Sequence, residues 1–179
     1  YARGNYLTTI ENTGELAGEL AETFEPNDDA SEWTFNLLSG VEFHNGKSMT
    51  ADDVIASFQY HMGENSKSAA KGLLTQVNEI VKDGDNRVIF KLAGGNADFP
   101  FIVSDYHIPI LPSEGGEIDA GNMDATGPYK LESFEPGVRA ELTRNPNYFK
   151  SDRAHFDAVE MISILDTTAR QNAVMNGEV

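Results

Sequence analysis

The sequence predicts a mixed α/β fold of the α+β kind, and three observations support this. Residues 32–37 alternate polar and apolar side chains with the period of two expected of a half-buried strand. Apolar residues at helical spacing follow Thr50, so a helix is expected there. Beyond residue 128 the pattern changes to short alternating runs separated by turn residues, which is typical of strands.

The first elements are short strands. A β-prone run over residues 6–10 precedes the turn Asn12-Thr13-Gly14. In the strand at residues 32–37, Trp33 shares a face with Phe35 and Leu37. We therefore expect Trp33 to lie in the core, in preference to serving as an exposed stacking platform.

A tight turn and a capped helix come next. Asn45-Gly46 is a residue pair that readily adopts positive φ, so it predicts the turn. Thr50 stands at the N-cap position of the helix, and Asp53 three residues later completes a capping pattern. A second, shorter helix is predicted within residues 63–74, and a hairpin over residues 79–92 turns at residues 83–86.

The middle of the chain predicts an edge strand followed by a linker. Pro100 disfavours a long helix in the apolar run 97–104. Residues 107–112 predict a strand at a sheet edge, because their prolines cannot donate to a β-ladder. Residues 113–124 are rich in glycine and acidic residues, so we place a domain boundary there.

The last third of the chain predicts strands and one helix. Residues 129–134 and 139–143 form a hairpin around Glu135-Pro136-Gly137, and residues 156–165 form another strand. Asp166 caps a helix predicted over residues 167–176, which Gly177 ends.

Several motifs lie in a fixed order along the chain. A long stretch over residues 16–57 is followed by Thr-Gly-Pro-Tyr at 126–129, Arg-Asn-Pro-Asn-Tyr-Phe at 144–149, and Asp-Thr-Thr-Ala-Arg at 166–170 with Asn-Gly-Glu at 176–178. Together these motifs closely resemble the extracellular solute-binding proteins of family 5, the dipeptide- and oligopeptide-binding receptors of ABC importers. Two scaffold positions depart from the family pattern: Leu38-Ser39 replace a basic residue, and Phe149 replaces a tryptophan.

The resemblance implies a class II periplasmic-binding-protein fold with two lobes and an inserted small domain. Residues 1–112 would be the small domain, and residues 113–179 part of the first large lobe, with the second ligand-binding lobe absent from this fragment. The change to a pure β pattern after the glycine-rich segment predicts that Gly127-Pro128 is the hinge where the chain crosses back between domains. The implied ligand is a peptide or another small solute, the implied partners are the permease subunits of an ABC transporter, and the implied location is the periplasm or the outer side of the membrane. We expect a monomer.

Charge and composition exclude several classes of function. The 179 residues include 13 lysines and arginines against 29 acidic residues, for a formal net charge of −16. Such a surface repels nucleic acid and anionic membranes, so neither is an expected partner.

No apolar run approaches the roughly 20 residues needed to span a bilayer. The chain has no cysteine, which removes thiolate chemistry. Residues 40–48 resemble a phosphate-binding loop but hold one residue too many between the glycines.

We expect no catalytic centre, metal or cofactor. The four histidines, His44, His61, His107 and His155, are scattered singly, and the acidic pairs stand in turns or at helix starts, where carboxylates commonly accept backbone hydrogen bonds. Ser104, Asp105 and His107 contain the residue types of a catalytic triad, but they are too close in sequence to form one on a strand.

Ser104, Asp105, Tyr106 and His107 are nevertheless the predicted ligand contacts. They lie next to the predicted domain boundary, and ligand sites favour domain interfaces. The alternative is that Tyr106 and His107 merely pack the end of a strand.

Two classes of function remain open. The first is a receptor that captures solute by closure of its lobes, with a peptide, a nickel complex, an oligosaccharide or an opine as its ligand, all four being implied by the family resemblance. The second is a hydrolase or a signalling domain on the same scaffold. Binding without turnover by the intact protein would separate them.

Overall fold

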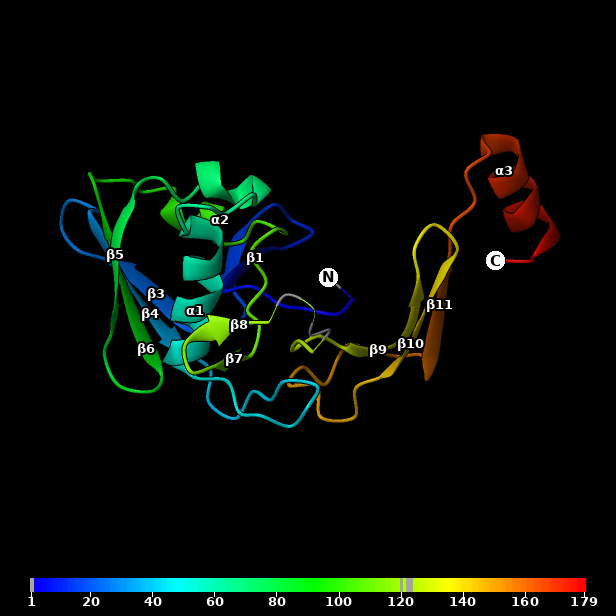
Figure 1. Ribbon diagram of the computed structural model, residues 1–179, viewed down its shortest axis with the longest axis horizontal. Helices are drawn as coiled ribbons and strands as arrows, with labels where there is room; N and C mark the ends of the chain where they lie inside the picture. Colours follow the sequence, from blue (N-terminus) through cyan, green and yellow to red (C-terminus); the bar gives the residue numbers. More distant parts are fainter. Residues whose placement is uncertain (1, 120, 122–123) are drawn as a thin grey trace.

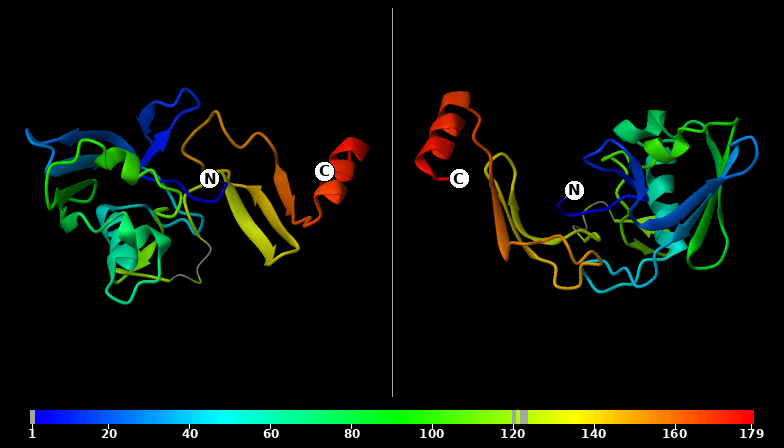
Figure 2. Two further views of the ribbon diagram at one scale, coloured as in Figure 1. Left: turned by 90° about the horizontal axis from the view of Figure 1, so that it is seen from above. Right: turned by 180° about the vertical axis from the view of Figure 1, so that it is seen from behind.

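An antiparallel sheet of four strands, in the order β3–β4–β6–β5, forms the centre of the first of two units (Figure 1). The computed structural model describes residues 2–119, 121 and 124–179. The first unit contains the strands and helices up to residue 118, and the second contains a three-stranded sheet and a C-terminal helix. In Figure 2 the second unit extends away from the first, which makes the molecule elongated.

The central sheet follows the alternation of its sequence. Along β4 every second side chain is buried, and Trp33 lies opposite Phe90 of β6. The predicted strand at residues 32–37 and the predicted hairpin at residues 79–92 are therefore confirmed. The strands are β3 (Ala21–Pro26), β4 (Glu32–Leu37), β5 (Val77–Lys82) and β6 (Arg87–Leu92).

Helix α1 (Ala51–Met62) packs against the sheet and completes the core. The ring of Phe58 meets the ring of Phe90 edge-on, with centroids 4.8 Å apart. Phe90 also contacts Phe35 and Phe99, so four buried phenylalanines join the helix, the sheet and the short helix α2 (Phe99–Ile102). The structure confirms two features of the predicted helix, its apolar face and its N-cap at Thr50.

The N-terminus of α1 is fixed by the buried carboxylate of Asp53. Oδ2 accepts the backbone N–H of Thr50 at 2.9 Å, while Oδ1 accepts the backbone N–H of Ser113 at 2.8 Å and its hydroxyl at 2.9 Å. The ammonium of Lys47 forms an ion pair with Oδ1. Burial acts to raise the pKa of Asp53, but these hydrogen bonds outweigh burial and hold the pKa below its usual range. One side chain thus joins three segments of the first unit.

The predicted edge strand over residues 107–112 is wrong. The structure gives these residues no strand, although Ile108 and Ile110 are fully buried. The backbone N–H groups of this segment donate to separate acceptors and not to a neighbouring strand. The N–H of Ile110 donates to the carbonyl of Asn5 at 3.0 Å, and the N–H of Leu111 donates to the hydroxyl of Ser57 at 3.0 Å. The prolines at 109 and 112 lack the N–H groups that a regular ladder would need.

Two further predictions need adjustment. Residues 63–74 contain only one short 3₁₀ helix, η1 (Ala69–Gly72), where a longer helix was expected. The predicted linker at residues 113–124 begins with a small hairpin, β7 (Ser113–Glu114) and β8 (Glu117–Ile118), which contacts α1. By its packing this hairpin lies with the first unit. The division of the chain into domains at residue 113 stays a prediction, and residues 120, 122 and 123 of that segment lie outside the described residues.

The N-terminal hairpin of the first unit consists of β1 (Thr8–Ile10) and β2 (Leu16–Gly18). β1 contacts α2, and the hydroxyl of Thr8 donates to the carbonyl of Pro100 at 2.6 Å. The hairpin therefore lies beside the segment that leads into residues 104–107.

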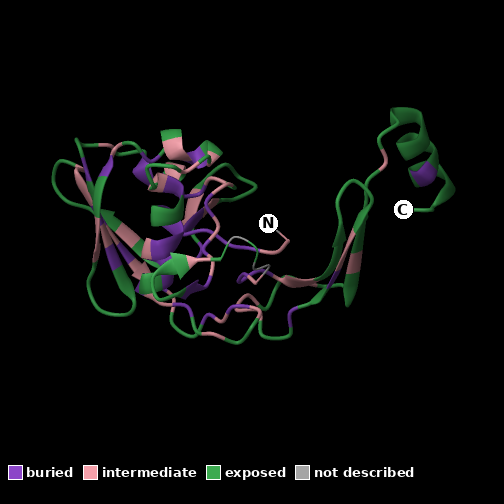
Figure 3. Cartoon of the chain, in the orientation of Figure 1, coloured by how far each residue is buried: buried purple, intermediate pink, exposed green. Residues whose placement is uncertain are grey.

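The second unit is an open sheet with little burial (Figure 3). Its strands β9 (Tyr129–Glu135), β10 (Arg139–Arg144) and β11 (Ala158–Ile162) pair in the order β11–β10–β9. Helix α3 (Thr167–Asn176) follows, with the Asp166 carboxylate accepting the N–H of Ala169 at 2.8 Å and Gly177 in the left-handed region at φ 69°. The predicted hairpin, cap and helix of this part are confirmed.

Replacing Trp33 with alanine is expected to lower the free energy of unfolding by about 3–5 kcal/mol. Trp33 is 6 % exposed, and its indole N–H donates to the carbonyl of Asn96 at 3.0 Å, so the change removes buried apolar volume and a hydrogen bond. Urea denaturation measures the effect, with Phe156→Ala at an exposed position as the control. An unchanged midpoint for Trp33→Ala would contradict the core role.

Replacing Asp53 with alanine is expected to cost about 3 kcal/mol, because it breaks a buried ion pair and its hydrogen bonds. The pH dependence has a definite sign. Because the folded-state pKa lies below the unfolded value of about 3.9, the stabilisation is present above that value and is lost as the pH falls through the folded pKa.

Urea midpoints at pH 7, 4 and 3 test this sign. Asp53→Asn should lose less stability on acidification than the parent chain, whereas the exposed Asp85→Asn should behave as the parent does. Parallel curves for the parent and Asp53→Asn would refute the assignment.

Candidate functional site

The two units meet where residues 2–5 cross residues 126–129. The N–H of Gly127 donates to the carbonyl of Arg3 at 2.7 Å, and the N–H of Tyr129 donates to that of Ala2 at 3.0 Å. A Cβ at position 127 would lie 2.3 Å from the carbonyl carbon of Arg3, so no other residue fits there without moving the backbone. We call this crossing the junction. It includes the predicted hinge, Gly127 and Pro128, whose role as a hinge stays a prediction.

His44 reinforces the junction from the turn that precedes α1. Its Nε2 lies 3.0 Å from the carbonyl oxygen of Gly127, and since a carbonyl can only accept, Nε2 carries the proton. Its backbone carbonyl accepts the ammonium of Lys130 at 3.0 Å. Burial is the main cause that lowers the pKa of His44, with the charge of Lys130 acting in the same direction. His44 is thus held in its neutral form.

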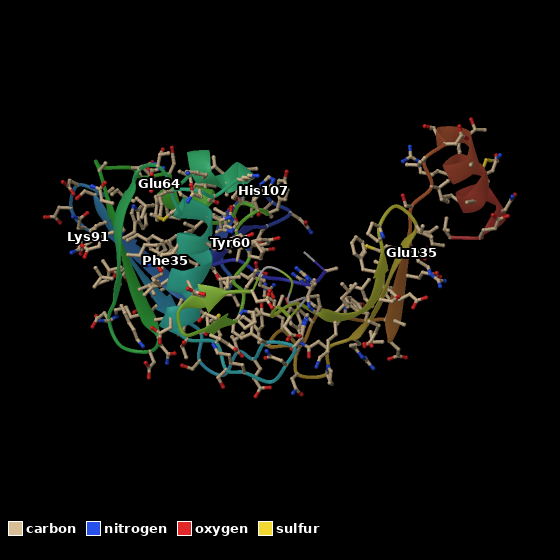
Figure 4. All side chains as sticks on the ribbon, in the orientation of Figure 1. Phe35, Tyr60, Glu64, Lys91, His107 and Glu135 are labelled. Atoms are coloured by element: carbon tan, nitrogen blue, oxygen red, sulfur yellow. The ribbon has the colours of Figure 1, made fainter. Side chains whose placement is uncertain are left out.

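Of the four predicted ligand contacts, the structure brings Asp105 and His107 together. Nδ1 of His107 lies 2.7 Å from Oδ1 of Asp105, which also accepts the backbone N–H of His107 at 2.9 Å. Nδ1 therefore donates, and in the neutral ring Nε2 remains an acceptor. In Figure 4, His107 lies at the margin of the first unit toward the second unit.

The other two predicted contacts differ from each other. Tyr106 is 62 % exposed, and its ring lies against that of His107 with centroids 3.8 Å apart. Ser104 is buried, and its hydroxyl donates to the carbonyl of Phe101 at 2.8 Å. Tyr106 and His107 are thus available to a ligand, whereas Ser104 is used within the fold. The role of all four as ligand contacts stays a prediction.

His61 of α1 lies close enough to His107 for an electrostatic interaction between the two rings. Its Nδ1 is 2.6 Å from the hydroxyl of Ser68, and the side chain is buried, as expected of a packing histidine. Burial first, and the charge of His107 second, lower the pKa of His61.

The structure also shows a polar pocket that the sequence did not predict. It has a volume of about 480 Å³ and opens between the β1–β2 hairpin and the segment that carries Tyr148 and Lys150. The carboxylate of Glu19, 8 % exposed, lies at its wall: Oε1 accepts Nδ2 of Asn5 at 2.8 Å and the ammonium of Lys150 at 2.9 Å. We call this cavity the Glu19 pocket.

Asn5 links the Glu19 pocket to the junction. Its Nδ2 also donates to the hydroxyl of Tyr148 at 3.1 Å, and its Oδ1 accepts the hydroxyl of Thr126 at 3.1 Å. Residues 5 and 148 are 143 positions apart in the chain. A contact between residues so far apart leaves no local pattern in the sequence. The motif at residues 144–149 includes Tyr148, but it indicated the family and not the pocket.

Within residues 2–119, 121 and 124–179, no group of three or more histidine, cysteine, aspartate or glutamate side chains is placed to hold a metal ion. No helix in the described part of the chain combines the length and apolar character needed to cross a membrane. The expectation of no cofactor stays a prediction.

Comparison with known proteins identifies the family. A family model described as bacterial extracellular solute-binding proteins, family 5 Middle, matches residues 15–179. The chain belongs to this family. The resemblance predicted from the motifs is confirmed, and so is the mixed α/β fold of a receptor fragment.

The family relatives differ in the solutes that their names state. The peptidoglycan-binding protein YepA of Agrobacterium fabrum is 30 % identical over 97 % of this chain and 30 % of its own length. The oligopeptide-binding protein AppA of Bacillus subtilis is 25 % identical over 98 % of this chain and 34 % of its own. The solved structure of AgaA with agropinic acid, from A. tumefaciens R10, superposes with a TM-score of 0.91 at 24 % identity, covering 99 % of this chain and 37 % of that one. This chain thus spans about a third of the length of its relatives.

Replacing His44 with glutamine is expected to reduce the loss of stability between pH 7 and pH 5. The folded state lowers the pKa of His44 and holds the ring neutral. Below the pKa of histidine in the unfolded chain, about 6.5, the unfolded chain therefore binds more protons than the folded chain, and stability is lost as the pH decreases. Glutamine can keep a donor toward Gly127 but gains no charge.

Thermal midpoints at pH 7, 6 and 5 measure the difference, with His155→Gln at an exposed position as the control. His61 adds a slope of the same sign, so part of the pH dependence should remain in His44→Gln. A variant as pH-sensitive as the parent would show that His44 is not held neutral at the junction.

Proposed function

We propose that the receptor containing this chain captures a peptide or a similarly small polar solute by closure of its lobes and delivers it to the permease of an ABC importer. In this proposal residues 1–112 form the small domain and residues 113–179 part of the first large lobe, and a further lobe outside this chain closes over the ligand. The receptor acts as a monomer in the periplasm or on the outer side of the membrane.

The observation that carries the proposal is the Glu19 pocket. Its walls come from both units, with Asn5 and Glu19 from the first and Tyr148 and Lys150 from the second. Ligand sites favour such positions between domains, and a volume of about 480 Å³ lies within the common range of small-molecule pockets. The pocket therefore lies where two units of the receptor meet, a position that supports solute binding.

The names of the relatives support a peptide-like or polar solute. They mention oligopeptides and peptidoglycan, and the superposed structure holds agropinic acid. All three are polar and need hydrogen-bonding groups of both kinds. The solutes named for these relatives differ from one another.

The hydrolase alternative finds less support in the geometry. The hydroxyl of Ser104 donates to the carbonyl of Phe101 and not to His107, so the Ser104, Asp105 and His107 side chains are not arranged as a nucleophile with its base. We therefore infer a receptor that binds without turnover.

The experiment that tests the proposal is mass spectrometry of solute released from the full-length receptor after purification from its own host. A peptide or small polar solute, released unchanged, is the expected result. A receptor that carries no solute and binds none from a panel of peptides, sugars and opines would overturn the proposal, and a processed product would favour the hydrolase.

Alanine substitution of Asp105, Tyr106 and His107 in the full-length receptor is expected to weaken solute binding while the thermal midpoint stays nearly unchanged. Tyr106 and His107 offer a ring face and a ring nitrogen to a ligand, and Asp105 fixes the ring. Loss of one such contact typically costs about 0.5–1.5 kcal/mol, or about two- to tenfold in affinity.

Calorimetry with the identified solute measures the affinity, and Tyr60→Ala, another exposed aromatic side chain of the first unit, is the control. Variants that lower the thermal midpoint at intact affinity would show that these residues are scaffold.

A further inference from the structure

Helix α1 carries three buried polar side chains on one face, at intervals of four residues. They are Asp53, Ser57 and His61. Residues four apart in a helix lie one above the other on the same face. A buried helix face is normally apolar, and a buried polar group is costly unless it is bonded. This row therefore requires partners in the segment that covers it.

Residues 107–113, which we call the strap, supply two of these partners. Oδ1 of Asp53 accepts the backbone N–H of Ser113 at 2.8 Å, and the hydroxyl of Ser57 accepts the backbone N–H of Leu111 at 3.0 Å. The order of the partners shows that the strap runs along α1 in the direction opposite to the helix. Because residues 107–112 form no strand, these side-chain bonds take the place of a β-ladder in holding the strap to the fold.

His61, the third member of the row, meets the other end of the strap at His107. The charge of His107 acts on His61, and Figure 4 labels His107 close to Tyr60, the neighbour of His61 in α1. The ring of His107 is itself bound, since its Nδ1 lies 2.7 Å from Oδ1 of Asp105. The strap is thus held to α1 by a carboxylate at one end and meets a buried histidine at the other.

The surroundings of His61 favour its neutral form. Burial first, and the charge of His107 second, lower its pKa. The hydroxyl of Ser68, 2.6 Å from Nδ1, is an uncharged partner. The ammonium of Lys71 is directed to two backbone carbonyls just after α1, at 3.0 and 2.6 Å. The charged or titratable side chains on the segments 60–71 and 104–107, apart from His61, are those of Tyr60, Glu64, Lys67, Lys71, Asp105, Tyr106 and His107.

Acid acts on the histidine end of the strap. When His107 gains a second proton, the carboxylate of Asp105 stabilises the imidazolium because the charges are opposite. A charged His107 in turn opposes a charge on the buried His61. If this end of the strap moves away from α1, His61 becomes hydrated and loses the neighbouring charge. The opened form then binds a proton more readily than the closed form, so acidification favours opening.

The carboxylate end responds differently. Burial acts to raise the pKa of Asp53, but the hydrogen bonds from Lys47 and Ser113 outweigh burial and hold the pKa below its usual range. The carboxylate therefore stays charged in mild acid and keeps its bonds to Ser113.

We propose that the strap is a pH-sensitive device, which stays fixed to α1 at Asp53 and Ser57 and opens at the His61 end in mild acid. Opening moves the turn that contains Asp105 and Tyr106, because this turn leads directly into the strap. Tyr106 is exposed, so packing opposes its movement little. This property is additional to the proposed capture of solute and does not depend on it.

Hydrogen–deuterium exchange of the full-length receptor at pH 7.5 and 5.5, read by mass spectrometry and corrected for the intrinsic exchange rate at each pH, tests the device. Peptides covering residues 105–111 and 112–119 report on its two ends. Protection of residues 105–111 is expected to fall about three- to tenfold at pH 5.5, since one added proton shifts the equilibrium at most tenfold for each pH unit below about 6.5. Residues 112–119 should keep their protection. Equal losses in both peptides, or no loss in either, would overturn the inference.

Three substitutions assign the effect to its side chains. His61→Gln should remove the loss of protection at pH 5.5, because glutamine gains no charge and can still bond to Ser68. His107→Gln should reduce this loss, because it removes the second charge. His155→Gln, at an exposed position, is the matched control and should behave as the parent does.

A His61→Gln receptor that is as pH-sensitive as the parent would contradict the device. If that variant does not fold, His107→Gln decides in the same way, since His107 is partly exposed and its replacement disturbs the core little. The measurement needs no solute, so its result is independent of whether the proposed capture is right.

Discussion

The position of the second unit depends on one close backbone crossing, that of Gly127 against Arg3. A Cβ at residue 127 would lie 2.3 Å from the Arg3 carbonyl carbon and 2.7 Å from the amide nitrogen of Gly4. The crossing is closed by the 2.7 Å hydrogen bond from Gly127 to Arg3. The bond from Tyr129 to Ala2 at 3.0 Å lies directly beside this crossing.

The crossing organises the polar groups around it. The carbonyl of Gly127 accepts both Nε2 of His44 and Nδ2 of Asn145, at 3.0 and 3.1 Å. Thr126 and Asn5 exchange two bonds, and Asn5 reaches on to Glu19 and Tyr148. Among the described residues, every buried side-chain nitrogen or oxygen has a hydrogen-bond partner. Asn5 therefore belongs to both the junction and the Glu19 pocket.

Local signals in the sequence predicted the elements that depend on local forces. The strand at Trp33, the helix capped at Thr50 and the helix capped at Asp166 follow from alternation and caps, which act over a few residues. Residues 107–112 were mistaken for a strand because their apolar alternation is real, yet the bond of Ile110 to Asn5 is made 105 positions away in the chain. The Glu19 pocket was missed for the same reason, since Glu19 and Lys150 are 131 positions apart. The family motifs supplied the fold, but not the contacts between distant residues.

At Gly127 the structure adds a requirement that the sequence did not indicate. The sequence predicted a hinge from the change to a pure β pattern and from the glycine-rich segment before it, whereas the structure requires glycine at position 127 because a side chain would not fit. Rotation about Gly127-Pro128 alone would break the bonds to Arg3, His44 and Asn145. Several buried hydrogen bonds, each worth about 0.5–1.5 kcal/mol, oppose such a movement. We therefore expect the two units to move as one body around the junction, which leaves the Glu19 pocket intact.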